Sequence, residues 1–202
     1  MFIPDIFKFE DWEEKIAFIK QYSFASIITV KDGLPIATHL PFAIDDSSEK
    51  LILTSHFAAA NEQSKFIEES ISLVIFSEPH AYISPTHYDK IESVPTWDYI
   101  TVHAYGKAKI ISDENMKYKA LEKMIMSYEQ SYKEQWDNLP DKFKKSMMRG
   151  ITAFEFEVTD LQGQKKLSQN KTEIERERIA DHLEKSDQTV EKQLSPYLKS
   201  TI

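Results

Sequence analysis

Apolar and polar residues alternate over several short segments of the chain, and other short segments are continuously apolar. Alternation with a period of two is typical of a half-buried strand, and short apolar runs are typical of buried strands. Lys31–Gly33 is a tight turn in which Gly33 supplies the positive φ of a hairpin. The pattern predicts strands over Phe24–Val30, Leu34–Ile44, Leu51–Thr54, Ser72–Phe76, Tyr99–Ile111 and Ile151–Val158.

Apolar residues recur at helical spacing in other segments. The clearest repeat follows Asp113, which is a good N-cap residue, and Gly150 is placed to end the next helix. The tail from Thr172 is charged and helical in pattern, whereas Leu194–Ile202 is expected to be frayed. Helices are predicted over Asp11–Tyr22, Ala58–Glu69, Asp113–Lys133 and Asp141–Arg149.

About six strands with few crossover helices predict an α+β fold, in which an antiparallel sheet closes as a barrel with helices at its periphery. Residues 1–170 are expected to form this domain, with inserted helices at about 113–149. Residues 171–202 are expected to form a C-terminal helical tail.

A dense polar and aromatic block interrupts the strand pattern at His80–Pro85 and again at Val94–Tyr99. Proline is unwelcome in a central strand, so the chain is expected to bend here or to lie at a sheet edge. Rings and hydroxyls on a bent β frame suit a planar polar ligand. Asp98 fits a pocket wall, but it fits equally well as the partner of a lysine or the cap of a turn.

The amino-acid composition excludes several kinds of functional site. The 202 residues contain no cysteine, which excludes disulfides, thiolate catalysis and iron–sulfur clusters, and only four glycines, too few for a glycine-rich phosphate loop. A net charge of −8 argues against a broadly basic surface for nucleic acid. No apolar run reaches membrane-spanning length and no signal-peptide pattern begins the chain, so cytoplasmic residence is expected.

Several collinear blocks resemble the PaiB family of FMN-binding proteins, described as negative transcriptional regulators of protease synthesis and sporulation in bacilli. Ala58–Ala60 stands where the family often has an arginine, and Glu62 stands where proline is common. The main matching blocks are Met1–Pro4, Thr38–Phe42, Ser55–Asn61, Val74–Phe76, Pro79–Pro85, Val94–Tyr99, Val102–His103, Gly150–Ile151, Phe154–Glu155 and Lys166–Asn170.

The resemblance implies a Greek-key split barrel of the FMN-binding type, related to pyridoxamine-phosphate oxidases, and a homodimer with FMN between its subunits. FMN needs a flat surface for its ring system, hydrogen-bonding groups, and cationic or hydroxyl groups for its phosphate. The predicted FMN contacts are Thr38, His39, His56, Asn61, Tyr82, Ser84, Thr96, Trp97, Lys166 and Ser168.

Simpler interpretations stand beside these assignments. Thr38–Phe42 fits a strand that ends at an edge, because Pro41 prevents further pairing. Ser55–Asn61 fits a strand-to-helix turn with Ser55 as N-cap, although a helix N-terminus also suits a phosphate. Lys165–Lys171 fits a solvated loop, a flavin contact or a small DNA-contacting patch, but the nearly charge-balanced tail argues against strong nucleic-acid binding.

Alternative functions remain open. Five of the six histidines lie between His39 and His103, which suggests a metal-binding or haem-binding site as an alternative. The histidines do not have HExxH spacing, so no metal ion is expected. A flavin-dependent oxidoreductase fits the same block, although no residue pair demands acid–base chemistry. The family resemblance implies a regulatory role, but the sequence shows no helix-turn-helix pattern that would bind DNA. The partner is therefore expected to be either DNA, bound through another surface, or a regulatory protein.

Overall fold

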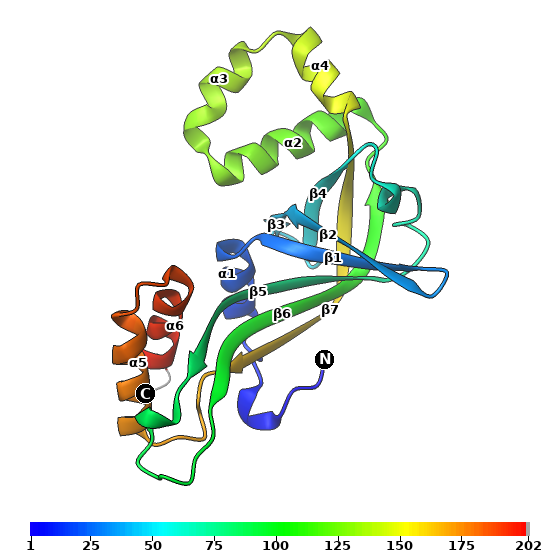
Figure 1. Ribbon diagram of the computed structural model, residues 1–202. Coiled ribbons are helices and arrows are strands. Elements are labelled where there is room, and N and C mark those ends of the chain that lie inside the picture. Colours follow the sequence, from blue (N-terminus) through cyan, green and yellow to red (C-terminus); the bar gives the residue numbers. More distant parts are fainter. Residues whose placement is uncertain (201–202) are drawn as a thin grey trace. The chain divides into compact units, whose positions relative to one another are not determined.

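The computed structural model describes residues 1–200, in which one sheet has the strand order β2-β1-β5-β6-β7-β4-β3 (Figure 1). The strands are β1 (Phe24–Lys31), β2 (Leu34–Pro41), β3 (Ala43–Asp45), β4 (Ile52–Ala58), β5 (Ser72–Ile83), β6 (Thr96–Ile110) and β7 (Ile151–Lys166). The helices are α1 (Trp12–Gln21), α2 (Glu114–Tyr128), α3 (Lys133–Asn138), α4 (Asp141–Arg149), α5 (Glu173–Glu184) and α6 (Thr189–Lys199), with short 3-10 turns η1 (Asp5–Phe7), η2 (Glu62–Lys65), η3 (Pro85–His87) and η4 (Gln130–Tyr132).

The chain divides into two compact units. Unit 1 comprises Met1–Lys15, Ser77–Val102 and the described part of Gln162–Ile202, and unit 2 comprises Ile16–Phe76 and His103–Leu161. Strands β5, β6 and β7 contribute residues to both units. The predicted division at residue 170 stays a proposal.

In unit 2, β1 and β2 form the predicted hairpin, which Figure 1 shows as a long two-stranded arm. Asp32 and Gly33 have φ values of 52° and 78°, the left-handed conformation that a two-residue hairpin turn requires. The predicted single strand Leu34–Ile44 is wrong in one respect, because it is broken at Phe42. The buried Phe42 ring packs edge-on against Phe76 and Phe154, so burial of this ring separates β2 from β3.

Helices α2, α3 and α4 follow β6 and precede β7 in the chain, and Figure 1 shows them grouped together beyond the ends of these strands. Asp113 caps α2 as expected, since its side chain accepts a hydrogen bond from the Met116 backbone. The helix ends at Tyr128 instead of Lys133, because the Glu129 backbone is extended, with φ −149° and ψ 90°. The Tyr128 hydroxyl anchors this end through hydrogen bonds with the Ser23 hydroxyl and the Phe42 carbonyl oxygen. Helix α3 was not predicted, whereas α4 has the predicted bounds.

The predicted helix Ala58–Glu69 is wrong. Strand β4 continues to Ala58, which pairs with Ile151, and only the short turn η2 follows. The fully buried Gln63 side chain explains the difference, because its amide hydrogen-bonds the Thr29 and Thr38 side chains. These tertiary hydrogen bonds outweigh the high helical propensity of the Ala, Glu, Gln and Lys residues in this segment.

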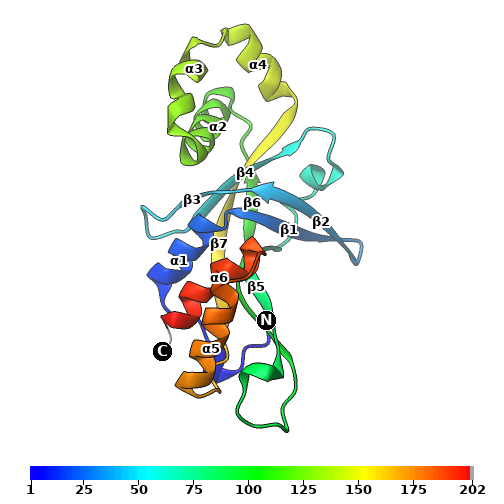
Figure 2. The same cartoon turned by 60° about the vertical axis from the view of Figure 1, so that its left-hand side comes forward.

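In unit 1, helices α5 and α6 pack side by side, as Figures 1 and 2 both show. Thr172 and Glu175 form a reciprocal capping box at the start of α5. The predicted frayed end is wrong up to Lys199, because Leu194 and Leu198 are fully buried in α6. Residues 201 and 202 of that prediction lie outside the described residues.

The strands around the polar and aromatic block are longer than predicted. Strand β5 continues through Pro79 to Ile83, and its pairing with β1 covers Leu73–Ile75. Residues His80–Ile83 of β5 therefore lie beyond the part of the strand that pairs with β1. This side of β5 is a local sheet edge, as predicted for the polar and aromatic block. Among residues 1–200, no helix combines the length and apolar character that crossing a membrane requires.

Candidate functional site

Two neighbouring strands of unit 1 present an exposed aromatic cluster. Tyr82 of β5 and Trp97 of β6 meet edge-to-face with ring centroids 6.1 Å apart, and His80 lies 5.8 Å from the Trp97 ring. Tyr82 is 47% exposed and Trp97 54% exposed. The two rings stand at 74° to each other, so each exposed ring by itself offers a flat apolar face to a ligand.

The end of β7 places a lysine beside this cluster. Lys166 donates hydrogen bonds to the Thr96 hydroxyl and to the Trp97 carbonyl oxygen. The turn that follows is rigid, because Leu167 is fully buried and Ser168 has a φ of 55°. Gln169 closes the turn by accepting from the Leu167 N–H and donating to the Lys165 carbonyl oxygen.

Asp98 is fully buried beneath this turn. Its Oδ2 accepts a hydrogen bond of 2.7 Å from the Ser168 hydroxyl, whereas its Oδ1 is buried without a hydrogen-bond partner. Burial raises the pKa of Asp98 to about 6, and the Ser168 hydrogen bond and the Lys166 charge limit that rise. Asp98 is thus bonded to the turn through Ser168, in agreement with the expected turn cap, and the Lys166 charge also acts on it.

A cavity of about 190 Å³ opens beside Asp98. Lys171 lies over the Tyr88 ring, with Nζ 3.7 Å from the ring centroid, and the Tyr88 hydroxyl is also buried without a hydrogen-bond partner. We call this cavity the Asp98 pocket. The residues that define it here are Tyr88, Thr96, Asp98, Lys166, Ser168 and Lys171.

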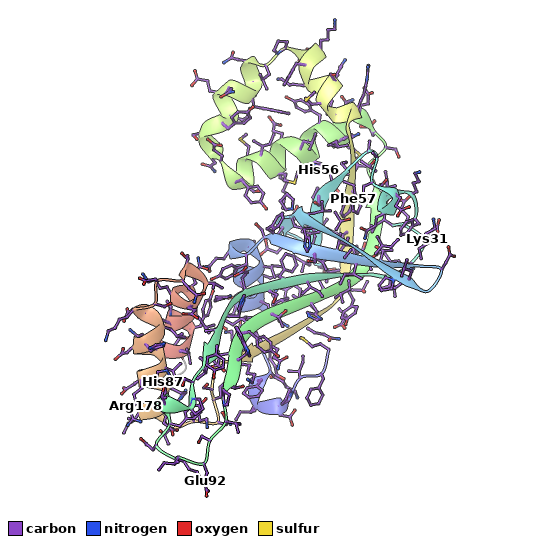
Figure 3. All side chains as sticks on the ribbon, in the orientation of Figure 1. Lys31, His56, Phe57, His87, Glu92 and Arg178 are labelled. Carbon is purple, nitrogen blue, oxygen red and sulfur yellow. The ribbon has the colours of Figure 1, made fainter. Side chains whose placement is uncertain are left out.

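Ser84 has a different role from its predicted neighbours. Its hydroxyl oxygen accepts hydrogen bonds from the Thr86 N–H at 3.2 Å and the Thr86 hydroxyl at 3.0 Å, and so caps η3. Behind η3, Arg178 of α5 binds the His87 carbonyl oxygen and the Asp89 carboxylate (Figure 3). Ser84 is absent from the Asp98 pocket, and its flavin contact stays a prediction.

In unit 2, the structure brings Thr38 and Asn61 together through Gln63. The Asn61 amide donates to the Thr38 hydroxyl at 3.0 Å, and that hydroxyl donates to Gln63 Oε1 at 2.7 Å. Asn61 Oδ1 accepts from the Gln63 N–H at 2.9 Å. The network joins β2 to η2. Gln63 was not predicted, because nothing in the sequence distinguishes a buried glutamine from an exposed one.

His39 lies on the opposite face of β2 from Thr38, since successive side chains of a strand alternate. Its Nδ1 is hydrogen-bonded to the Ser26 hydroxyl at 2.8 Å, and its ring stacks 6.5 Å from the exposed Phe24 ring. His39 therefore belongs to the outer face of the hairpin, apart from Asn61.

His56 lies on β4 next to the buried Phe57 (Figure 3), and its Nδ1 is buried without a hydrogen-bond partner. Burial lowers the pKa of His56, and the nearby Lys117 ammonium lowers it further, so the ring is neutral at pH 7. The prediction that Ser55 caps a helix is wrong, because Ser55 lies within β4 and its hydroxyl donates to the Pro41 carbonyl oxygen.

Residues 1–160 match the family described as "Putative FMN-binding domain", and the chain belongs to this family. It is 35% identical to the protease synthase and sporulation protein PAI 2 of Bacillus subtilis, over 100% of this chain and 98% of that protein. The predicted relationship to PaiB is confirmed.

Solved structures show the same fold at low identity. The flavocytochrome Anf3 from Azotobacter vinelandii matches with a TM-score of 0.63 and 16% identity, over 79% of this chain and 69% of that chain. A FAD and haem binding protein from Mycobacterium smegmatis matches with a TM-score of 0.62 and 12% identity, over 79% of this chain and 73% of that chain. The predicted α+β split-barrel fold class is confirmed.

Proposed function

We propose that this protein binds FMN and acts as a cytoplasmic regulatory protein. The observation that carries the proposal is the exposed Tyr82–Trp97 cluster beside the Lys166 ammonium in a chain of an FMN-binding family. FMN combines a flat ring system with an anionic phosphate, and these residues supply the matching surface and charge. When bound, the flavin supplies reversible electron transfer.

The predicted contacts divide into two sets. In unit 1, Tyr82 and Trp97 would face the ring system. The unit 1 residues that would offer hydrogen bonds and positive charge are Ser84, Thr96, Lys166 and Ser168. The contacts proposed in unit 2 are Thr38, His39, His56 and Asn61. The buried Nδ1 of His56 has no hydrogen-bond partner, whereas Thr38 and Asn61 already bond each other.

The test is a fluorescence titration of FMN with wild-type protein and with Trp97→Ala. Loss of one aromatic ring is expected to raise the dissociation constant about fivefold, since an aromatic contact is worth about 1 kcal/mol. Trp12→Ala is the matched control, because Trp12 is similarly exposed at 49% but lies outside the cluster. Equal FMN binding by all three proteins would place the flavin elsewhere, and no binding by any of them would end the proposal.

We also propose a homodimer. The outer face of the β1–β2 hairpin is apolar and exposed, with Phe24 at 67% and Val30 at 52% exposed, and it includes the Ile28–Ala37 pair. An exposed apolar sheet face is typical of an interface. Sedimentation should show a dimer that Phe24→Glu converts to a monomer, whereas Leu34→Glu on the other face should leave it intact. A monomeric wild-type protein would contradict this.

A flavin-dependent oxidoreductase is the second candidate. It is favoured by Asp98, a buried acid whose pKa of about 6 allows proton exchange near neutral pH. Oxidation of NADH or NADPH by the FMN-loaded protein separates the two candidates, because a binding protein shows no steady-state turnover.

The regulatory role is supported by the PAI 2 relative and by its full-length match to this chain. The proposed regulatory role is the only support for a DNA or protein partner. The net charge of −8 favours a protein partner over extensive contact with a phosphate backbone. A gel-shift assay with and without FMN tests direct DNA contact, and a clear shift would reverse this preference.

A further inference from the structure

The Asp98 pocket has an excess of positive charge. Lys166 and Lys171 contribute two ammonium groups against the single carboxyl group of Asp98. Lys166 hydrogen-bonds only neutral groups, and Lys171 contacts the Tyr88 ring. Within residues 1–200, neither ammonium has a carboxylate at ion-pair distance. A cavity of this charge in an acidic protein attracts a small anion.

The same pocket contains two polar atoms whose bonding is incomplete. Asp98 Oδ1 is buried without a hydrogen-bond partner, and the buried Tyr88 hydroxyl has the Ser168 side chain near it but no well-formed hydrogen bond. Leaving buried polar groups unpaired is costly, so such atoms usually mark a missing ligand or water. A purely structural role for this turn explains the Ser168–Asp98 bond but not these two atoms.

Asp98 also restricts which anion fits. The second carboxylate oxygen is already bonded to Ser168, so Oδ1 is the atom that a ligand would meet. A carboxylate is an acceptor only, and therefore it repels an anion without protons but accepts a hydrogen bond from an anion that carries an O–H. Phosphate keeps one O–H at neutral pH, whereas sulfate has none.

We propose that the Asp98 pocket is a phosphate site, in which Asp98 Oδ1 bonds a protonated phosphate oxygen while Lys166 and Lys171 bind the anionic oxygens. A cavity of about 190 Å³ is too small for a whole drug-sized ligand but sufficient for a phosphate group. The phosphate comes from one of two sources, free phosphate or the phosphate monoester of a larger ligand. The proposal rests on the proposed function only where that ester is FMN.

The charged groups around Asp98 define how pH acts. Lys166 of β7 and Lys171 before α5 face the pocket, and Tyr88 follows η3. The Glu175 carboxylate lies outside the lining and accepts the Asp89 and Thr172 N–H groups, but its negative charge acts on Lys171 and Tyr88. A phosphate monoester has its second pKa near 6, close to that of Asp98. One proton is therefore shared between ester and carboxyl, and ester binding weakens as pH rises from 6 to 8.

The test is calorimetry of the full chain with inorganic phosphate and with sulfate at pH 7.5. Wild-type protein should bind phosphate at least about tenfold more tightly than sulfate, because only phosphate satisfies Asp98. Asp98→Asn should abolish this preference by improving sulfate binding, since the amide donates a hydrogen bond. Asp187→Asn makes the same charge change at an exposed position and should leave the preference intact.

A second variant guards against misfolding of the first. Lys171→Met removes one ammonium whose contact is the Tyr88 ring, and it should weaken phosphate and sulfate alike. The proposal is overturned if wild-type protein binds phosphate no more tightly than sulfate, or if folded Asp98→Asn retains the wild-type preference.

FMN and riboflavin separate the two sources. If FMN supplies the phosphate, inorganic phosphate competes with FMN, and FMN binds more tightly than riboflavin. If the phosphate is separate, FMN and inorganic phosphate bind together without competing. If neither flavin binds while phosphate still does, the proposed function fails and the phosphate site stands.

Discussion

Replacing Asp98 with asparagine should stabilise the folded protein at neutral pH. Asp98 is fully buried, and its side chain bonds Ser168 while one oxygen lacks a partner. Asparagine has nearly the same shape and keeps an oxygen for the Ser168 hydroxyl, but it carries no charge that burial would penalise. The substitution therefore isolates the cost of ionising this one buried group.

The magnitude follows from the pKa of Asp98, which burial raises from 3.8 to about 6. At about 1.4 kcal/mol per pKa unit, ionised Asp98 costs the folded state about 3 kcal/mol at neutral pH. Because the folded-state pKa is raised, the folded state binds the proton more tightly, and wild-type stability falls as pH rises from about 4 through about 6. The stability of the Asp98→Asn variant does not fall in this pH range, because asparagine does not ionise.

The assay is urea denaturation of both proteins at pH 4.5 and pH 7.5, and the expected change in their stability difference between these pH values is about 2 kcal/mol in favour of Asp98→Asn. Asp187→Asn, at an exposed position, should show a difference that is nearly independent of pH. A stability difference for Asp98→Asn that is equal at both pH values would refute the argument, because Asp98 would then titrate normally.

Three further substitutions test other parts of the structure. Lys117→Met should raise the pKa of His56 by removing a nearby positive charge, as measured by NMR titration, and an unchanged pKa would leave burial as the whole cause. Leu194→Ala should cost about 2–5 kcal/mol in urea denaturation, because Leu194 is fully buried, and a cost near zero would restore the frayed tail. Gly106→Ala should lower the melting temperature strongly, since its Cβ would lie 2.1 Å from the Glu157 carbonyl oxygen, and an unchanged melting temperature would contradict that close approach.

Local signals in the sequence predicted elements whose causes are local. The Asp32–Gly33 turn needs positive φ, and the Asp113 cap and α4 depend on neighbouring residues. The segment Ala58–Glu69 failed as a helix because the partners of Gln63 lie 25 to 36 residues away. Helical propensity contains no information about such distant partners.

The residues of the candidate site also include some that local sequence patterns predict and others that depend on distant parts of the chain. The polar and aromatic block pointed to Trp97 and Tyr82, because their neighbours are too polar for a dry core, and the family resemblance added Lys166 and Ser168. The burial of Asp98 could not be predicted from the sequence, because its partner Ser168 lies 70 positions away in the chain. Only the folded chain shows that one carboxylate oxygen is satisfied and the other is not.

The most direct test of flavin binding is the visible absorption spectrum of the protein after incubation with FMN and removal of unbound ligand. Our account predicts flavin bands that remain with the protein at about one flavin per chain. A colourless protein, or one that acquires only a haem band after haemin is added, would contradict it.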